Sequence, residues 1–442
     1  MSAEGVLRRS SYGPTSPMVG QRGARTRERI VSEALTLFAA QGFHGTSVHD
    51  ISAAAEISRA TFYQYFESKE EIFVQLLDEC GGALVDVVRQ LGPLGPTAEG
   101  FGNLYSWLLA WGQIYDKYST MFVQWANVDS SGTAIRPLVT GFVESFDARV
   151  ARRLKQTDLE GLSAPDAAVV LTSVVNRFNY LRHVTSSPTT DLEGPSHHLA
   201  VILQTVLFPS TPVEVTRRAL GGQPDWSRPR APSAAAGAAP VPGDVPDRFT
   251  PLTARGATTV RELMDAGGRV FAERGYQRAN VDDIVGVAGF ARGTFYKYFD
   301  EKLDLLVALS DQCRGEAVQI AHTFEDVEPG DGEALRAWLT EYVDFHSRYV
   351  GVIRVWLERT PNHPALDRDR VLVLEAMRRA LYAHLERVPR SQPLDLRVAE
   401  VFQVALLERL PETYRPRAKR GRTPQMVELM AQVLERGLFT PR

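Results

Sequence analysis

One short phrase occurs twice in this chain, and the repetition limits the possible folds more than any other feature. Residues 58–66 read SRATFYQYF, and residues 291–299, which lie 233 positions later, read ARGTFYKYF. When residues 26–80 are laid on 259–313 without a gap, about 19 of the 55 positions are identical. Fainter matches follow: Trp107, Tyr118 and Trp125 fall opposite Trp338, Tyr349 and Trp356. Each repeat spans roughly 200 residues, too long for a solenoid unit, so the sequence indicates a duplicated protein.

The composition is that of an ordinary globular protein. Of the 442 residues, 44% are apolar and 23% are charged, and the net charge is −3, so any basic surface must be local. We expect no membrane span, because no apolar run approaches about 18 residues. The N-terminal segment lacks the apolar core of a secretory signal. Cys80 and Cys313 occupy equivalent positions of the two repeats and predict neither a disulfide framework nor a metal site. We therefore expect a cytoplasmic protein.

Each repeat begins with a predicted series of short helices. In the first repeat, apolar residues recur at helical spacing over 27–41, and Gly42 is expected to end that helix in the left-handed conformation. Ser47 to Asp50 has the capping-box pattern of a helix start. A three-residue turn then separates this helix from a second one over 59–65, and a longer helix begins at Lys69. The second repeat has the same pattern. Such an arrangement is a helix-turn-helix module.

The second short helix of each module has one apolar and one polar face. Phe62 and Phe66 are four residues apart and are expected to point inward. Arg59, Tyr63 and Gln64 then point outward, and these residue types hydrogen-bond phosphates and base edges. The helix that begins at Lys69 offers free amides and an ammonium group to a phosphate. The alternative is that the aromatic residues serve only the core. The agreement of caps, turn length and two copies favours contact with DNA.

These motifs resemble those of a known family. The phrases T-x-F-Y-x-Y-F-x-x-K and F-A-x-x-G-[FY], present in both repeats, are similar to the DNA-binding domain of TetR-family transcriptional regulators. The resemblance implies an all-α protein of two TetR-like units. Each unit would have an N-terminal three-helix DNA-binding domain and a C-terminal helical bundle that binds a ligand and dimerises.

The family's DNA contacts can be carried over by position. In the first repeat the implied contacts are Thr46, Ser47, Arg59, Ala60, Thr61, Tyr63, Gln64, Tyr65 and Lys69. In the second repeat they are Asn280, Arg292, Gly293, Thr294, Tyr296, Lys297, Tyr298 and Lys302. Two positions depart from the family pattern. Ala279 replaces the hydroxyl of Thr46, which predicts one missing phosphate contact. Glu56 stands where the family often has Gly, and a left-handed Glu costs on the order of 1 kcal/mol.

The predicted domains follow from the repeat, the modules and a segment between the repeats that is rich in Pro, Ala and Gly. They are a disordered arm (1–22), a first DNA-binding domain (23–70), a first helical ligand-binding and dimerisation domain (71–208), a linker (209–255), a second DNA-binding domain (256–303) and a second helical ligand-binding and dimerisation domain (304–442).

Aromatic residues recur at spacings of three and four in the remainder of each repeat, and two interpretations stay open. They belong to an ordinary core, or they line an apolar ligand pocket between helices. The candidate pocket residues are Trp107, Trp111, Tyr115, Phe122 and Trp125 in the first repeat, and Trp338, Tyr342, Phe345 and Trp356 in the second. Because few charges interrupt these stripes, a small apolar effector is expected.

The last two helices of each repeat are predicted over 166–184 and 195–208, and over 395–410 and 423–438. In the resembled family this pair forms a four-helix dimer interface; the alternative is packing within one repeat. A linker of about 43 residues has a root-mean-square span of roughly 33–39 Å, enough to join two units of a dimer. We therefore expect a monomeric pseudo-dimer, or a homodimer, on a double-stranded operator that is an imperfect inverted repeat.

A ligand-responsive repressor is the expected function, and two other functions are alternatives to it. The first is an enzyme. The sequence has no phosphate-binding Gly-rich loop, no metal-spaced His cluster and no nucleophile elbow, so we expect no catalytic residue, no metal and no cofactor. The second is a helical ligand-binding or scaffolding protein in which one DNA-reading unit is inactive. Arg292, Thr294 and Tyr296 are retained in the second unit, so decay is not evident.

Overall fold

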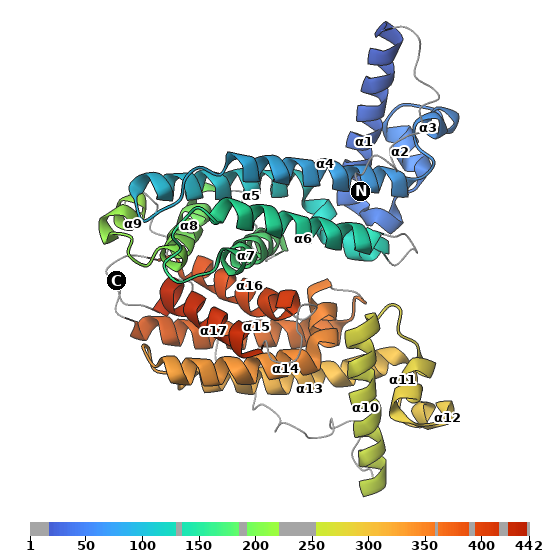
Figure 1. Cartoon of the computed structure of the whole chain (residues 1–442). Helices are drawn as coiled ribbons and strands as arrows, with labels where there is room; N and C mark the ends of the chain where they lie inside the picture. The colour runs from blue at the N-terminus through green and yellow to red at the C-terminus, as the bar shows by residue number, and fades with distance from the viewer. Residues whose placement is uncertain are drawn as a thin grey trace. The chain divides into compact units, whose positions relative to one another are not determined.

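The computed structural model describes residues 17–129, 135–184, 192–220, 253–358, 361–388, 394–414 and 423–439. These residues form helices joined by turns and contain no strand, which confirms the predicted all-α fold (Figure 1). They divide into two compact bodies. The smaller body contains residues 1–89 and 113–146, and the larger contains 90–112 and 147–442. The larger body therefore holds the C-terminal helices of the first repeat and the whole second repeat.

The helices of the two repeats follow the same order. The first repeat contains α1 (Pro17–Gly45), α2 (Val48–Ala54), α3 (Arg59–Tyr65), α4 (Lys69–Gln90), α5 (Ala98–Asp129), α6 (Ile135–Leu154), α7 (Ala164–Val184), α8 (Glu193–Leu207) and α9 (Val213–Leu220). The second contains α10 (Ala254–Arg274), α11 (Val281–Ala288), α12 (Arg292–Tyr296), α13 (Lys302–Glu325), α14 (Gly332–Glu358), α15 (Pro364–Arg387), α16 (Leu396–Tyr414), α17 (Thr423–Leu434) and a π-helical turn, η3 (Glu435–Phe439). Helices α1–α3 are named the first head and α10–α12 the second head.

Phenylalanines hold the first head on the helix that follows it. The rings of Phe38 and Phe43 lie 5.3 Å apart, and Phe43 packs edge-on against Phe73 of α4 at 5.3 Å. Phe62 and Phe66 are buried as predicted, and their rings lie 6.0 Å apart. Apolar burial of this kind contributes about 1.5–3 kcal/mol for each large side chain. The first head thus shares a small aromatic core with α4.

The second head is fixed to its bundle by a close backbone approach. Helix α10 crosses α14 at Gly351, where an added Cβ atom would lie 2.7 Å from Cβ of Phe271 and 2.8 Å from the backbone N of Ala272. Any larger residue at position 351 would push the two helices apart, because real Cβ contacts are not this short. The close contact at Gly351 therefore fixes the position of α10 on α14.

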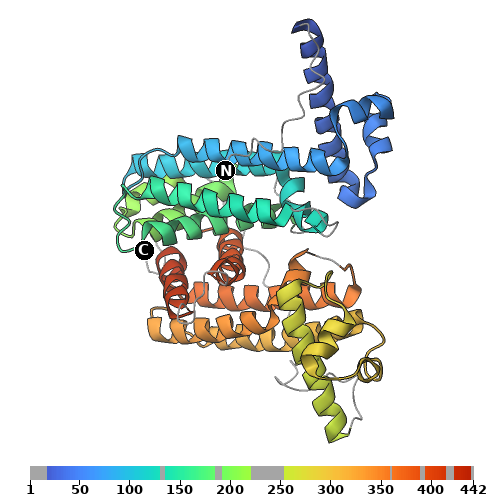
Figure 2. The same cartoon turned by 45° about the vertical axis from the view of Figure 1, so that its right-hand side comes forward.

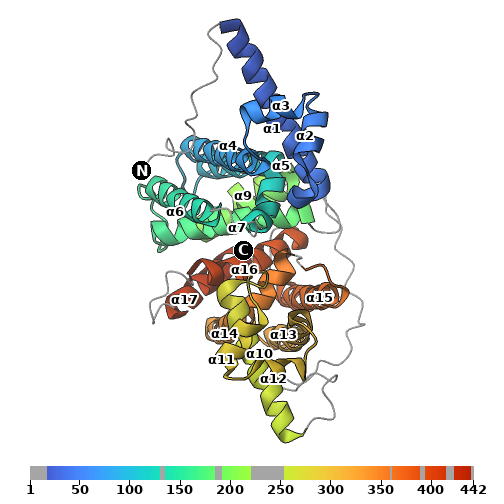
Figure 3. The same ribbon diagram turned by 90° about the vertical axis from the view of Figure 1, so that its right-hand side faces the viewer.

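Helices α13–α17 form the bundle of the second repeat. Figure 3 shows α13 and α15 nearly end-on, and these two helices pack along each other. In Figure 2, α16 and α17 (red) lie against the orange helices, in agreement with their contacts to α14 and α15.

The thiol of Cys313 is buried inside this bundle, as that of Cys80 is in α4. Burial raises the pKa of Cys80 to about 12, which fits a packing role for both cysteines.

The C-terminal helices of both repeats pack together in the larger body. Helix α7 lies along α16, and α8 contacts α16, α17 and η3. One face of α7 is apolar and buried, and it consists of Leu171, Val174, Val175 and Phe178. Polar contacts join the two repeats as well. Arg177 forms a salt bridge of 2.5 Å with Glu408, and Arg436 donates to the backbone O of Glu160 at 2.8 Å.

At three places the helix ends of the structure differ from the expectation. Helix α1 begins at Pro17, so the predicted arm 1–22 overlaps the helix; residues 1–16 lie outside the described part of the chain. The predicted linker 209–255 contains α9 and the start of α10. Helix α9 forms because Thr216 and Leu220, four residues apart, are both buried. Gly42 has the expected positive φ of 78°, but its ψ of 162° is not left-handed helical, and a short helical segment continues to Gly45. Among the described helices, none is both long and apolar enough to cross a membrane.

Candidate functional site

Hydrogen bonds at both helix starts fix the orientation of α2 and α3. The backbone N of Ser47 donates to Oδ2 of Asp50 at 2.9 Å, and the backbone N of Asp50 donates to Oγ of Ser47 at 3.2 Å. These bonds from Ser47 hold the pKa of Asp50 below its usual value. At the next helix, the backbone N of Thr61 donates to Oγ of Ser58 at 3.0 Å. The predicted capping box is therefore confirmed, and α3 has a side-chain cap of its own.

Helix α3 separates its apolar and polar residues as expected. Phe62 and Phe66 are buried, whereas the ring of Tyr63 is 58% exposed. An exposed tyrosine beside two buried phenylalanines is not needed for the core of the head. The other predicted contacts on this helix are exposed or half-buried: Arg59, Ala60, Thr61, Gln64 and Tyr65. The polar face can therefore reach a partner without any change in the core.

Helix α12 presents an equivalent face in the second head. Phe295 and Phe299 are buried and Tyr296 is 46% exposed. Asn280 forms the predicted capping box with Asp283, and Gly289 ends α11 in the left-handed conformation at φ 74°. The remaining predicted contacts are exposed or half-buried: Arg292, Gly293, Thr294, Lys297 and Tyr298.

Helices α3 and α12 are called the reading helices below. Each begins with an arginine, and the two arginines have different neighbours. Nη1 of Arg292 lies 2.9 Å from Oδ2 of Asp282, and its Nη2 donates to the hydroxyl of Tyr296 at 3.2 Å. Both members of the ion pair are more than half exposed. In the first head, His49 stands at the position of Asp282. The second head therefore holds its arginine close to a carboxylate, and the first head has no carboxylate at that position.

Lys69 and Lys302, which were predicted to contact phosphates, form hydrogen bonds within their own heads in this structure. Nζ of Lys69 donates to the backbone O of Phe43 at 2.7 Å and of Thr46 at 2.8 Å. Nζ of Lys302 donates to the backbone O of Tyr276 and Ala279, both at 3.0 Å, and of Gln277 at 3.4 Å. An ammonium group has three donors, so these carbonyls occupy most or all of them. Both lysines hold the loop before the second helix of the head.

Thr46 is also placed differently from the expectation. Its side chain is 1% exposed, and its hydroxyl donates to the backbone O of Gly42 at 2.8 Å. Ala279, the equivalent residue, is buried as well. The absent hydroxyl in the second repeat therefore removes this internal hydrogen bond. Position alone could not reveal this, because Thr is common both at caps and at surfaces.

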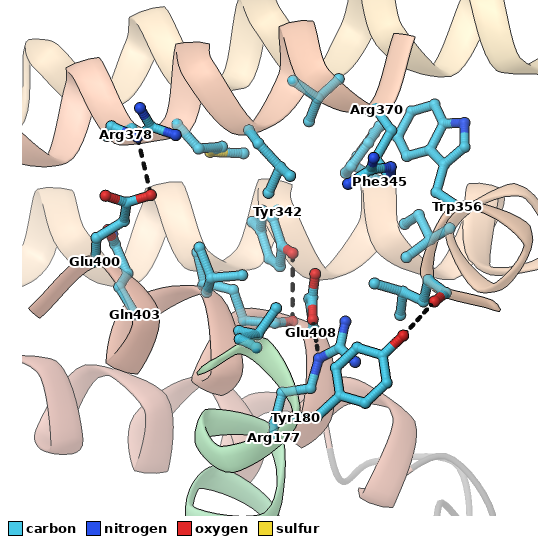
Figure 4. Close-up of a pocket in the computed structure, with 18 residues that line it drawn as sticks. Arg177, Tyr180, Tyr342, Phe345, Trp356, Arg370, Arg378, Glu400, Gln403 and Glu408 are labelled. Carbon is cyan, nitrogen blue, oxygen red and sulfur yellow. Dashed lines mark hydrogen bonds and ion pairs between the residues drawn. The ribbon is translucent and has the colours of Figure 1, made fainter. Parts of the chain in front are cut away.

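One cavity of about 100 Å³ lies inside the bundle of the second repeat (Figure 4). Helices α14, α15 and α16 form most of its wall, and α7 of the first repeat adds Arg177, Tyr180 and Leu181. Three of its rings come from the candidate pocket residues Tyr342, Phe345 and Trp356, and a fourth comes from Tyr180. The expected apolar character is incomplete, because five charged residues also line the cavity: Arg177, Arg370, Arg378, Glu400 and Glu408.

The other candidate pocket residues do not line this cavity. Trp338 donates from Nε1 to the backbone O of Ile320 at 2.8 Å and packs against Phe324. In the first repeat the aromatic residues pack in pairs, with 5.1 Å between the rings of Trp107 and Trp111 and 4.3 Å between those of Tyr115 and Phe122. These contacts are those of packed core residues, and the alternative of a ligand pocket in the first repeat stays a prediction. The side chain of Trp125 lies outside the described residues.

Sequence reasoning missed the polar members of the cavity wall. When Asn176 is placed opposite Glu408, Ala168 and Leu171 of α7 fall opposite Glu400 and Gln403 of α16. These replacements put polar residues on a helix face that is apolar in the first repeat. Such a difference between two otherwise similar helices is the signal from which the polar wall of the cavity could have been found.

Comparison with known proteins adds independent findings on both heads. Residues 30–76 and 263–309 match the family described as bacterial regulatory proteins, tetR family. The HTH-type transcriptional regulator TcmR of Streptomyces glaucescens is 40% identical over 78 residues, which are 17% of this chain and 34% of TcmR.

Two similar proteins carry the printed name biofilm operon icaADBC HTH-type negative transcriptional regulator IcaR. The one from Staphylococcus epidermidis is 33% identical over 60 residues, which are 14% of this chain and 32% of that protein. The one from Staphylococcus aureus is 28% identical over 102 residues, or 23% of this chain and 54% of that protein. The chain thus spans about a third to a half of the length of these relatives.

Proposed function

Both repeats carry the N-terminal sequence of the tetR family of bacterial regulatory proteins, so the chain belongs to that family, and we propose that it is a sequence-specific DNA-binding transcriptional repressor. The observation that carries the proposal is the pair of short helices, α3 and α12. Each exposes a tyrosine and an arginine next to two buried phenylalanines. Side chains of this kind on a capped helix can enter a major groove and contact phosphates and base edges.

The first experiment measures binding to the duplex DNA upstream of the chain's own gene by fluorescence anisotropy. Tyr63→Ala and Tyr296→Ala each remove one contact to DNA, and a good specific contact contributes about 1–3 kcal/mol. We expect each variant to weaken binding by about 10-fold to 100-fold. The control is Arg89→Ala, which removes an exposed charge about 30 Å along α4 from Lys69. Unchanged affinity in both tyrosine variants would contradict the proposal.

We further propose that one chain acts as a pseudo-dimer, with α7 and α8 paired to α16 and α17. The Arg177–Glu408 salt bridge and the donation from Arg436 to the first repeat support this pairing. Asn176 is the counterpart of Glu408, so a pairing of two first repeats would lack this carboxylate. Light scattering at micromolar concentration, with and without operator DNA, is expected to show one chain per operator. Two chains joined through their first repeats on a perfect palindrome would contradict it.

The two reading helices are expected to prefer different half-sites. Gln64 and Lys297 are equivalent, and both are exposed. Gln pairs well with adenine and Lys with guanine in the major groove. We propose an imperfect inverted repeat as operator. Selection of binding sequences from a random pool tests this, since Gln64→Lys should make the two selected halves more alike. Two halves that are already identical for the unchanged chain would rule the asymmetry out.

We propose that a small molecule in the α14–α16 cavity lowers DNA affinity. A ligand shifts the equilibrium only through different affinities for two conformations. The cavity is suited to such coupling because its wall includes Arg177 and Glu408, which also join the two repeats. Trp356→Ala enlarges the cavity and is expected to alter the response to ligand before it alters DNA binding. If Trp356→Ala lowered stability and left the response to ligand unchanged, Trp356 would be a core residue and not part of a ligand site.

A further inference from the structure

The charges around the cavity do not balance. Three guanidinium groups and two carboxylates line it. Arg177 pairs with Glu408 at 2.5 Å, and Arg378 pairs with Glu400 at 2.9 Å, as Figure 4 shows. These two pairs use both carboxylates of the wall. Arg370 is the guanidinium that remains, and its ion-pair partner, Asp367, does not line the cavity, so the wall itself has one positive charge in excess.

Arg370 is weakly held by the protein itself. Nη2 lies 3.5 Å from Oδ1 of Asp367, which is at the limit of a hydrogen bond. Its Nε is buried and has no hydrogen-bond partner among the residues that the structure describes. The side chain is about three-quarters buried, with 24% exposed. A buried guanidinium with unused donors is costly unless an anion accepts from it, because desolvation weakens its interaction with water.

A second polar group faces the cavity at some distance from Arg370. Gln403 is 4% exposed and lines the cavity. In Figure 4 it lies on the side of Glu400, while Arg370 lies near Phe345 and Trp356. A buried amide has two donors and one acceptor oxygen to satisfy. The cavity therefore presents a cation at one end and a hydrogen-bonding amide at another.

Between these two groups the wall is aromatic and apolar. Tyr342, Phe345 and Trp356 contribute rings, and Met377 contributes a flexible thioether. Nε1 of Trp356 donates a hydrogen bond to Oγ of Ser310 at 3.0 Å. A ligand in the cavity would therefore contact the indole ring and not its N–H group. The volume of about 100 Å³ is somewhat smaller than the ~150 Å³ cavity that takes up benzene in a protein core. A single six-membered ring is therefore the largest body that this space takes up, and only when flexible side chains such as Met377 adjust.

We propose that this cavity binds a monocyclic aromatic carboxylate. The carboxylate lies on Arg370, the ring lies among Tyr342, Phe345 and Trp356, and Gln403 receives a polar ring substituent. Binding of such an acid does not depend on DNA; only its role as effector rests on the proposed function. Because Ala168 and Leu171 replace Glu400 and Gln403 in the first repeat, we expect one site per chain.

Isothermal titration calorimetry of the full chain without DNA tests the proposal. The probes are benzoate and 4-hydroxybenzoate, with benzamide as a neutral analogue and acetate as an acid without a ring. We expect saturable binding of one benzoate per chain, at least tenfold weaker binding of benzamide, no binding of acetate and tighter binding of 4-hydroxybenzoate. Equal binding of benzoate and benzamide, or no binding of either aromatic acid, would overturn the proposal.

Variants assign the binding to the named residues. Arg370→Gln is expected to weaken benzoate binding at least tenfold, and Arg370→Lys less. Gln403→Leu should remove only the preference for 4-hydroxybenzoate. Arg368→Gln is the matched control, since Arg368 lies on the same helix, is 63% exposed and does not line the cavity. Thermal melts establish that each variant folds. Benzoate affinity unchanged in folded Arg370→Gln would overturn the assignment. A chain that binds benzoate but no upstream DNA would leave this inference intact and remove the proposed repressor.

Discussion

The two heads have nearly the same architecture, and each contains one local defect that the other lacks. In the first head, Glu56 adopts φ 52° in the turn between the short helices, where the second head has Gly289 at φ 74°. In the second head, Ala291 precedes α12 and provides no side-chain cap, whereas Ser58 caps α3. Both heads nevertheless retain their buried phenylalanine pairs and capping boxes. These shared features determine the fold of a head, and a single defect of about 1 kcal/mol is tolerated.

The C-terminal helices show the opposite behaviour. Helices α7 and α16 occupy equivalent places in the two repeats, but polar residues of α16 stand opposite Ala168, Leu171 and Asn176 of α7. One of them, Glu408, joins the repeats, and Gln403 lines the cavity. The two repeats therefore share the folding pattern of their heads and differ more in the surfaces between their C-terminal helices. The following substitutions test this contrast.

The largest effect is expected at the contact between repeats. Glu408→Gln removes the charged partner of Arg177, whose side chain is 8% exposed. Removal of one partner from a buried ion pair costs about 3–5 kcal/mol, because the other charge stays buried. The midpoint of urea unfolding should fall accordingly. Glu428→Gln is the control, since Glu428 is 59% exposed and pairs with Arg336 near the surface, where such pairs contribute at most about 1 kcal/mol. Equal losses in both variants would refute a special role of the α7–α16 pair.

A smaller effect is expected from the lysine that begins α13. Lys302→Met leaves up to three backbone carbonyls without their donor, and an unsatisfied buried acceptor costs about 1–3 kcal/mol. Amide hydrogen exchange in α11 and α12 should therefore become faster. Lys297→Met is the matched control, because Lys297 is exposed on the reading helix. It should weaken DNA binding and leave hydrogen exchange unchanged. If both variants behaved alike, the internal role of Lys302 would be wrong.

The reading helices were predicted well because their information is local. The caps at Ser47 and Asn280 and the i, i+4 phenylalanines are each specified within a few residues, and the structure has them as expected. The internal hydrogen bonds of Lys69 were not predicted, because they are not local. Its partners, Phe43 and Thr46, lie 26 and 23 residues earlier, and no periodic pattern encodes a bond between a side chain and a distant carbonyl.

The cavity was predicted only in part, since its wall combines four helices from two repeats. A stripe of aromatic residues on one helix predicts a buried face but not what lies opposite. Tyr342 and Phe345 face the cavity, whereas Trp338 on the same helix bonds to Ile320 and belongs to the core. The charged members Arg177 and Arg370 come from α7 and α15, and their meeting depends on packing alone.

The capping difference between the heads can be exchanged directly. Ala291→Ser gives α12 the side-chain acceptor that Ser58 gives α3, and a new cap of this kind contributes about 0.5–2 kcal/mol. Hydrogen exchange in the first turn of α12, at Thr294 in particular, should become slower. The reciprocal Ser58→Ala should make exchange at Thr61 faster by a similar factor. An effect in one direction only would mean that the two helix starts are not equivalent.

The smallest effect is expected from the turn of the first head. Glu56 is exposed, and its φ of 52° is unfavourable for a residue with a Cβ atom. Glu56→Gly relieves strain on the order of 1 kcal/mol, and the greater freedom of Gly in the unfolded chain offsets part of that gain. We therefore expect slightly slower hydrogen exchange in α2 and α3, by less than about fivefold. The reciprocal Gly289→Ala should destabilise the second head through the backbone alone, because no atom lies within 4 Å of the added Cβ. Faster exchange in Glu56→Gly would show that the glutamate side chain stabilises the turn and that the two heads differ by more than their backbone conformation.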